Sequence, residues 1–208
     1  MTTLLQINTS LFSDGGQSTG LANEFVTAWR ATHPQATVIV RDLARDGVPH
    51  LTAERFQAFL SKPAERNADQ QAVVDYSDKL IDELKRADVI VIGAPMYNFG
   101  VPSTLKAYFD HVARAGVTFR YTDKGPVGML NGEKAYVFSS RGGFYAGTSR
   151  DTETNYLRDF LNFIGIADVA FVYAEGLNIN ETAKQAGLTQ AKSVIQQLTA
   201  TFSTTAAA

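Results

Sequence analysis

Five short apolar runs, separated by longer amphipathic stretches, constrain the fold of this 208-residue chain more than any other feature. The runs are Leu4–Ile7, Val38–Val40, Val89–Ile92, Ala135–Phe138 and Val169–Tyr173. They are mostly β-branched or aromatic, which favours buried strands. The stretches between them repeat apolar residues at helical spacing, as Leu21, Phe25 and Trp29 do. This alternation predicts an α/β fold with a five-stranded parallel sheet and helices on both faces.

We expect residues 1–208 to form a single domain, because no repeat, linker or change of composition divides the chain. Two segments, 44–67 and 116–132, are longer than ordinary connections. Long insertions in a compact domain are more often functional or interface-forming than idle. The second one alternates apolar and polar residues over Val117–Tyr121 and continues into Asp123–Pro126. That pattern predicts a small β-hairpin.

The charge balance and the lack of cysteine exclude several classes of function. A net charge of −2 argues against binding to nucleic acids or anionic membranes. The absence of cysteine excludes disulfides, thiolate-bound metals and thiol redox chemistry, so any redox group must be a bound one. The uncharged stretch Val89–Leu105 is interrupted by Pro95 and Pro102, and the N-terminus lacks the pattern of a signal peptide. We therefore expect a cytoplasmic protein with no membrane span.

Several common sites fail on inspection. The chain has no Walker phosphate loop, no GxGxxG after the first strand and no GxSxG elbow. Its histidines, His33, His50 and His111, are far apart and lack the spacing of metal ligands, so we expect no metal site.

Three loops remain, each following a predicted parallel strand at the sheet edge where α/β proteins bind ligands. The first, Asn8–Gly20, is rich in hydroxyls and glycines and lacks basic residues, so it could hold a phosphate with neutral donors at a helix N-terminus. Ser18 could equally be a helix N-cap in a polar turn. The second, Ala94–Pro102, carries Met, Tyr and Phe between two prolines, which suits a stacked aromatic ring. An ordinary core corner is the alternative.

The third loop, Ser139–Phe144, contains adjacent glycines that let a backbone approach a ligand closely, although it could be no more than a turn. Together the loops offer a phosphate site, an aromatic surface and backbone donors in order along one sheet edge. Flavin mononucleotide (FMN) has the complementary parts.

These residues resemble the bacterial FMN-dependent NADH:quinone oxidoreductases, also called azoreductases. The resemblance covers nearly the whole chain, and its most specific pieces are Ala94–Phe99, Val112–Tyr121 and Ser140–Gly143. It implies a doubly wound, flavodoxin-like fold. It also implies a homodimer with a flavin in a cleft at each subunit interface, and the transfer of two electrons from NADH or NADPH to quinones and azo compounds.

Carried over residue by residue, the resemblance implies a cofactor site made of Ser10, Gly16, Gln17, Ser18, Met96, Tyr97, Asn98, Phe99, Ser140, Arg141, Gly142 and Gly143. Tyr121 and Phe163 are similar to aromatic residues on the substrate side, contributed by the partner subunit. Members of the family tend to have serine where this chain has Gly16, so one hydroxyl is missing and the Gly16 N–H serves alone. This departure bears on FMN affinity rather than on activity.

We expect the cofactor to carry the chemistry in a ping-pong cycle, with no catalytic side chain. The backbone N–H groups of Gly142 and Gly143 would stabilise the negative charge of the reduced flavin, as an oxyanion hole does. The alternative is a flavodoxin-type electron carrier without a substrate of its own, which the small net charge disfavours. No residue pattern distinguishes NADH from NADPH as the donor, and none names the physiological acceptor.

Overall fold

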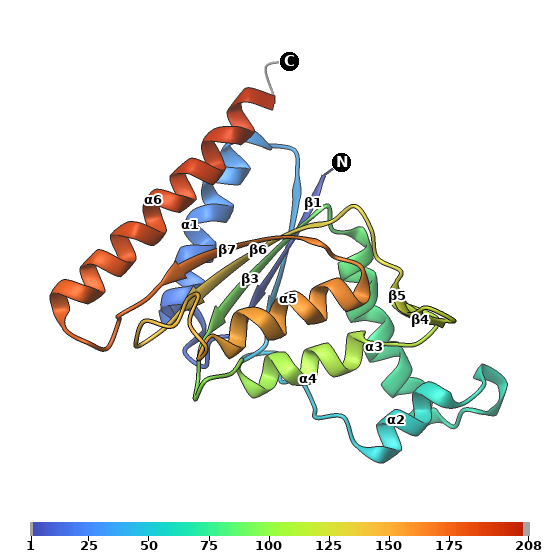
Figure 1. Ribbon diagram of the computed structural model, residues 1–208. Helices are drawn as coiled ribbons and strands as arrows, with labels where there is room; N and C mark the ends of the chain where they lie inside the picture. The colour runs from blue at the N-terminus through green and yellow to red at the C-terminus, as the bar shows by residue number, and fades with distance from the viewer. Residues whose placement is uncertain (1, 206–208) are drawn as a thin grey trace.

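The computed structural model describes residues 2–205. Its centre is a five-stranded parallel sheet in the order β2-β1-β3-β6-β7 (Figure 1). The strands are β1 (Thr3–Asn8), β2 (Thr37–Asp42), β3 (Val89–Pro95), β6 (Lys134–Ser140) and β7 (Asp168–Ala174). Each coincides with one of the five apolar runs, so the predicted flavodoxin-like α/β sheet is confirmed.

Helices cover both faces of the sheet, as the alternating sequence predicts. On one face lie α1 (Gln17–Thr32) and α6 (Glu181–Thr205), which run side by side in Figure 1. On the other lie α3 (Ala68–Arg86), α4 (Ser103–Val112) and α5 (Thr152–Ile164). Within residues 2–205 no helix is both long and apolar enough to cross a membrane.

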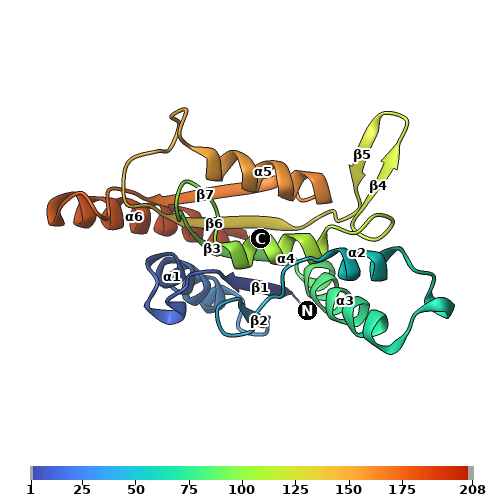
Figure 2. The same ribbon diagram turned by 90° about the horizontal axis from the view of Figure 1, so that it is seen from below.

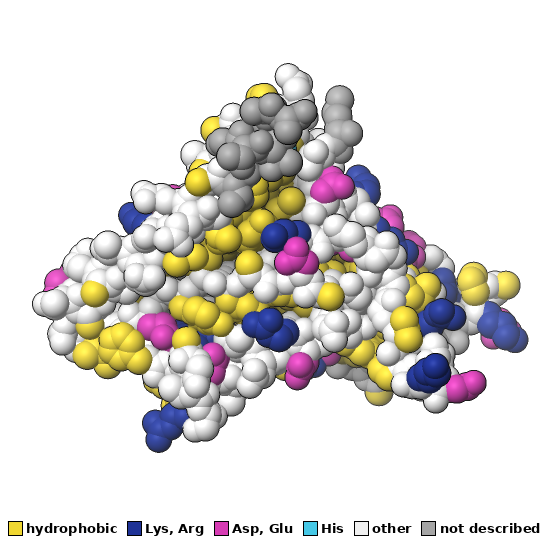
Figure 3. Space-filling view, turned by 45° about the horizontal axis from the view of Figure 1, so that its top comes forward, with side chains coloured by type: hydrophobic (Ala, Val, Ile, Leu, Met, Phe, Trp, Pro, Cys, Tyr) yellow, Lys and Arg dark blue, Asp and Glu magenta, His cyan; other side chains and the backbone are white. Residues whose placement is uncertain are grey.

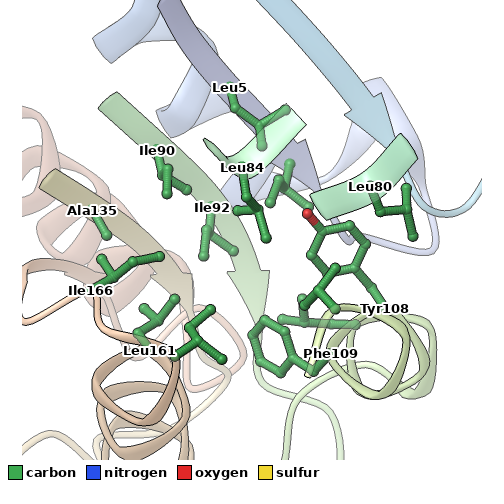
Figure 4. Packing of buried hydrophobic residues seen from close by; sticks show 14 of the residues in the cluster. Leu5, Leu80, Leu84, Ile90, Ile92, Tyr108, Phe109, Ala135, Leu161 and Ile166 are labelled. Atoms are coloured by element: carbon green, nitrogen blue, oxygen red, sulfur yellow. The ribbon is translucent and has the colours of Figure 1, made fainter. Parts of the chain in front are cut away.

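Each face of the sheet has its own hydrophobic core, because successive residues of a strand point to opposite sides. Leu5, Ile90 and Ile92 pack with α3, α4 and α5, as Figure 4 shows. Leu4 and Val91 point the other way and pack with α1 and α6 around Phe25, whose ring centroid is 4.5 Å from that of Tyr136. The apolar runs are continuous rather than alternating because both faces are covered.

The edge strand β7 is less completely covered than the central strands. Its residues Val169, Ala170 and Phe171 are half-buried. In the space-filling view, hydrophobic side chains form a band across the middle of the molecule, interrupted by charged groups (Figure 3). The guanidinium of Arg158 lies 5.0 Å from the centroid of the Phe171 ring. Arg158, on α5, thus covers part of the half-buried face of this strand.

The two long segments form extra elements. Segment 116–132 contains the predicted hairpin, with β4 (Phe119–Thr122) antiparallel to β5 (Gly125–Gly128). Segment 44–67 contains the short helix α2 (Ala53–Leu60) and the 3₁₀ turn η2 (Pro63–Glu65), which the sequence pattern did not predict. Both segments expose large apolar side chains, among them Phe56, Leu60 and Tyr121.

The strand order positions the functional edge. The chain moves from β1 outward to β2 and then returns to the other side of β1 to form β3, so the order reverses between β1 and β3. Ligands of such sheets bind beyond the carboxyl ends of the strands at this reversal. The backbone N–H and the hydroxyl of Thr9 both donate to the carbonyl of Gly93, at 3.2 and 2.8 Å, and so join the two strand ends.

Gly165 ends α5 with a left-handed backbone, φ 111°, and a Cβ there would lie 1.9 Å from the carbonyl oxygen of Leu130. We therefore predict that Gly165→Ala lowers the free energy of unfolding by about 3 kcal/mol, combining overpacking with the left-handed penalty. Gly147 also has positive φ, 74°, but a Cβ there meets nothing within 4 Å. Gly147→Ala should lower the free energy of unfolding by only about 1 kcal/mol. Urea unfolding measures both, and equal losses would contradict the packing role of Gly165.

Candidate cofactor and active site

A cleft of about 370 Å³ lies at the carboxyl edge of the sheet and is lined by all three loops that the sequence singles out. Ser10, Gly16 and Gln17 line it from the first loop, Met96 and Tyr97 from the second, and Ser140, Arg141 and Gly142 from the third. A hydrogen bond of 3.0 Å from the Met96 N–H to the Ser140 carbonyl joins the second and third loops. Residues far apart in the sequence thus meet in one concave site.

The first loop ends at the N-terminus of α1 without a side-chain cap. After the 3₁₀ turn η1 (Ser13–Gly15), the N-cap position is taken by Gly16. The first turn of α1 contains no acidic residue. Ser18 is inside the helix, so the N-cap interpretation of this serine is wrong. Its hydroxyl and that of Thr19 are buried and have no partner among the described residues. Unpaired buried donors at a helix N-terminus form a site for an anion.

The role expected for Gly16 needs a correction. Its N–H already donates to the carbonyl of Ser13 at 3.1 Å, so it does not serve as a free donor. A Cβ on Gly16 would lie 2.2 Å from the Ser10 hydroxyl oxygen and 2.5 Å from the Ser10 Cβ. Ser10 thus occupies the space in which a side chain at position 16 would lie. Glycine is required here by the packing of the loop itself.

The second loop is a tight turn with an uncommon backbone. Tyr97 and Gly100 exchange backbone hydrogen bonds of 2.9 and 3.0 Å, and the residues between them, Asn98 and Phe99, have φ of 51° and 65°. Positive φ at both central residues defines a type I′ turn, which asparagine tolerates and phenylalanine rarely adopts. The hydroxyl of Thr152, on α5, donates to the Phe99 carbonyl and holds the turn.

This turn presents its side chains outward instead of packing them into a core. Phe99 is 52% exposed, and its ring lies edge-on to Tyr145 at 5.6 Å between centroids. Met96 is half-buried and lines the cleft. The core-corner interpretation is therefore wrong for Phe99. Strained, exposed backbone at a cleft is a common feature of ligand-binding loops.

The third loop is held by a neighbouring loop that follows β7. The carbonyls of Arg141, Gly142 and Gly143 accept hydrogen bonds from the N–H groups of Leu177, Asn178 and Gly176. Across a trans peptide the carbonyl points opposite to the next N–H. The N–H groups of Gly142 and Gly143 are therefore directed away from the loop that follows β7. The arrangement is more than an isolated turn, because it fixes the direction of two backbone donors.

Arg141 contributes to this loop from beneath. Its side chain is fully buried. It pairs with Asp151 at 2.9 Å, Glu153 at 3.2 Å and Glu175 at 3.4 Å, and it lies over the ring of Tyr173. The paired carboxylates raise the pKa of Arg141 despite the opposing effect of burial. The guanidinium therefore acts as a permanent cation in the loop support.

Tyr121 and Phe163 do not line the cleft. Tyr121 is 75% exposed on β4 and contacts Phe119, which packs on Phe163 at 4.3 Å between ring centroids. The hairpin carrying Tyr121 lies at the opposite end of the molecule from the start of α6, a cleft-lining helix, in Figures 1 and 2. Within one chain these two residues form a separate aromatic cluster.

Six further cleft residues were missed by the sequence reasoning: Phe12, Gly15, Pro95, Leu177, Asn178 and Lys184. The last three follow β7, the fifth strand, whose carboxyl end reaches the same edge as the other loops. That position is the signal by which Leu177 and Asn178 could have been found. Lys184 lies within a helix and gives no comparable signal.

Comparisons with known proteins agree with this geometry. A family model described as "Flavodoxin-like fold" matches residues 2–199. An FMN-dependent NADH:quinone oxidoreductase from Cellvibrio japonicus is 55% identical over 95% of this chain and 98% of its own length. One from Alcanivorax borkumensis is 54% identical over 91% of this chain and 96% of its own.

This chain belongs to the family of FMN-dependent NADH:quinone oxidoreductases. Among solved structures, an FMN-dependent NADH-azoreductase from Bacillus anthracis, in complex with FMN, superposes with a TM-score of 0.85 and 26% identity. That similarity covers 96% of this chain and all of the Bacillus chain. Members of the family are named for FMN, and the cleft described above has the donors to hold it. The hydroxyls of Ser18 and Thr19, which have no partner among the described residues, lie at the start of α1 beside the cleft residues Gly16 and Gln17 and suit the phosphate.

Glu153, one of the carboxylates around Arg141, makes the free energy of unfolding depend on pH. Burial raises the pKa of Glu153 to about 7, since one guanidinium is shared among the carboxylates and Glu153 Oε1 has no partner in residues 2–205. The pKa of Glu153 in the unfolded chain is 4.5. The contribution of its protonated form to the free energy of unfolding is therefore complete below pH 4.5 and is lost as the pH rises through about 7. We predict that the free energy of unfolding of wild type falls by on the order of 3 kcal/mol between these pH limits relative to that of Glu153→Gln, whose side chain stays neutral.

Urea unfolding at several pH values between about 4 and 8, a range that includes both the unfolded pKa of 4.5 and the folded pKa of about 7, provides the test. The relevant quantity is the difference between variant and wild type, because burial lowers the pKa of His111 and works in the opposite direction. Parallel pH profiles for the two proteins would show that Glu153 does not titrate in this range.

Proposed function

We propose that this protein is an FMN-dependent oxidoreductase that transfers two electrons from NADH or NADPH to quinones and reductively cleaves aromatic azo compounds. One observation carries the proposal: a single cleft at the sheet edge is lined by the uncapped N-terminus of α1, by Met96 and Tyr97 at the base of the exposed turn, and by Gly142 of the donor loop. The names of its relatives and its structural neighbours support the same activity.

FMN would be held from end to end by the three loops. The N–H groups at the start of α1 and the Ser18 hydroxyl would bind its phosphate. Met96 and Tyr97 would contact the isoalloxazine, with Asn98 and Phe99 beside the ring and the ribityl chain. Ser140, Arg141, Gly142 and Gly143 would contact the pyrimidine side. The bound flavin supplies hydride acceptance at N5 and two-electron delivery to the acceptor.

The protein's part in catalysis is positioning and charge stabilisation. The N–H groups of Gly142 and Gly143 would donate to the oxygen on which negative charge develops, and their direction is fixed by the loop after β7. Arg141 would act by holding this loop, because its guanidinium is enclosed by carboxylates beneath it. No side chain is needed as acid or base, since solvent can supply protons.

Donor and acceptor would use the same face of the flavin in turn, giving a ping-pong cycle. A homodimer would complete each site: Tyr121 and Phe163 lie too far from the cleft of their own chain and would line that of the partner. The apolar side chains exposed on α2 and the hairpin support such an interface. The cytoplasm, where the nicotinamide donor is made and used, is the proposed location.

The direct test uses the purified protein and FMN. We predict a yellow complex that bleaches on anaerobic addition of NADH and recovers its colour when a quinone is added, because hydride enters and leaves through one cofactor. Spectra between about 350 and 550 nm follow both steps. A complex that NADH cannot bleach would favour the electron-carrier alternative. A protein that FMN cannot reconstitute would defeat both flavin functions.

Gly142 gives a test of the donor loop. A Cβ at this position would lie 2.9 Å from Nδ2 of Asn178, so a branched side chain should displace one loop or the other. We predict that Gly142→Val weakens FMN binding or slows its reduction about tenfold, with little change in the free energy of unfolding. Adding Asn178→Ala makes room and should recover part of the loss. Full FMN content and full turnover in Gly142→Val would contradict the assignment.

A further inference from the structure

Lys184 brings a positive charge to a cleft whose phosphate loop has none. The loop Asn8–Gly20 contains no basic residue, yet Lys184 lines the same cleft as Gly16 and Gln17. Its side chain is 38% exposed, so the ammonium is neither enclosed nor free in solvent. The sequence separation from the loop hides this proximity.

The packing of α1 against α6 explains how Lys184 reaches the loop. The two helices run side by side in the same direction (Figure 1), and Lys192 on α6 lies 3.6 Å from Glu24 on α1. Two turns earlier on α1 is Gln17, the first residue of the helix, and two turns earlier on α6 is Lys184. Lys184 and Gln17 therefore lie toward the same end of the two helices, and both line the cleft.

The charges around the cleft leave Lys184 available for an anion. Arg141, the other cation that lines it, is shared by Asp151, Glu153 and Glu175. The acidic residue of the first loop, Asp14, is paired with Arg45. Lys184 has only a long contact of 3.8 Å with Glu181, whose side chain is 72% exposed. Among the described residues that line the cleft, Lys184 is the one cation not surrounded by carboxylates.

The place of Lys184 in its helix points to the same conclusion. It lies in the first turn of α6, where the partial positive charge of the helix N-terminus disfavours a cation. A bound anion would offset this unfavourable interaction.

We propose that Lys184 binds the phosphate of FMN from the side of α6, completing a cradle otherwise made of neutral donors. This inference rests on the proposed function. It also accounts for the first loop, where the Gly16 N–H is used by Ser13 and no side chain can be placed at position 16. An ammonium at hydrogen-bond distance from a phosphate oxygen forms a charge-assisted contact, which is about twice as strong as a neutral one.

The test compares FMN with riboflavin, which has the same ring and ribityl chain without the phosphate. Lys184→Met keeps the length of the side chain and removes its charge. We expect this variant to bind FMN about tenfold more weakly, by quenching of flavin fluorescence on titration with apoprotein, and to bind riboflavin as wild type does. Wild-type affinity for FMN should fall with added salt more steeply than that of the variant.

Lys192→Met is the matched control, since Lys192 lies on the same helix but pairs with Glu24. It should bind FMN as wild type does, and Lys184→Arg should retain most of the affinity. An equal loss for FMN and riboflavin would overturn the proposal, because the phosphate would then not be the partner. Unchanged FMN affinity with a raised KM for NADH would also overturn it and would assign the ammonium to a phosphate of the donor. Failure of wild type to bind FMN would instead refute the proposed function.

Discussion

The buried guanidinium of Arg141 is the interaction on which the functional edge depends. It joins the end of β6 to Asp151 and Glu153 at the start of α5 and to Glu175 just beyond β7. A buried cation with one carboxylate partner would carry no net charge. Here three carboxylates surround one guanidinium, and a proton on Glu153 removes part of the excess negative charge. The cost of enclosing these groups is offset by holding three chain segments in one arrangement. The loop that contains Gly142 and Gly143 is then held in place although glycine itself restricts the backbone little.

The other loops are attached to this support by hydrogen bonds. The Met96 N–H reaches the Ser140 carbonyl, and Thr152, between the two carboxylates of α5, holds the turn at Phe99. Thr9 connects the end of β1 to Gly93 on β3. Through these contacts the three loops keep a fixed spacing. A flat cofactor whose parts are covalently connected requires such a spacing.

The fold could be predicted from the sequence because its signal is local. Each strand is a short apolar run, and the hairpin shows its alternation within Val117–Tyr121. Helix α2 was missed because it buries only Ala58 and exposes Phe56 and Leu60, so its apolar residues do not follow a buried face. The order of the strands was not predicted, since no local pattern sets it; the family resemblance implied only the flavodoxin-like class of fold.

The functional site, like the fold, could be predicted from the sequence only where its signal is local. Its loops could be found because they follow the strands, but what each group does there depends on partners distant in sequence. Arg141 is 34 residues from Glu175, and nothing near Arg141 indicates that it is buried. The loss of the Gly16 N–H to Ser13 is a matter of loop conformation. Sequence therefore places the donors at the edge, and only the packing decides which remain free for a ligand.

That distinction explains how a nearly neutral, cysteine-free chain can hold an anionic redox cofactor. The groups proposed to bind the cofactor are mainly hydroxyls, helix N–H groups and glycine N–H groups, which carry no charge that depends on pH. Apart from Lys184, which we propose reaches the phosphate, the charged residues near the cleft have other partners: Arg141 is enclosed by its carboxylates, and Arg45 neutralises Asp14. Separating support from recognition leaves the cleft free of strong fixed charge on the ring side. Uncharged, flat acceptors such as quinones can then enter without paying for the desolvation of an ion.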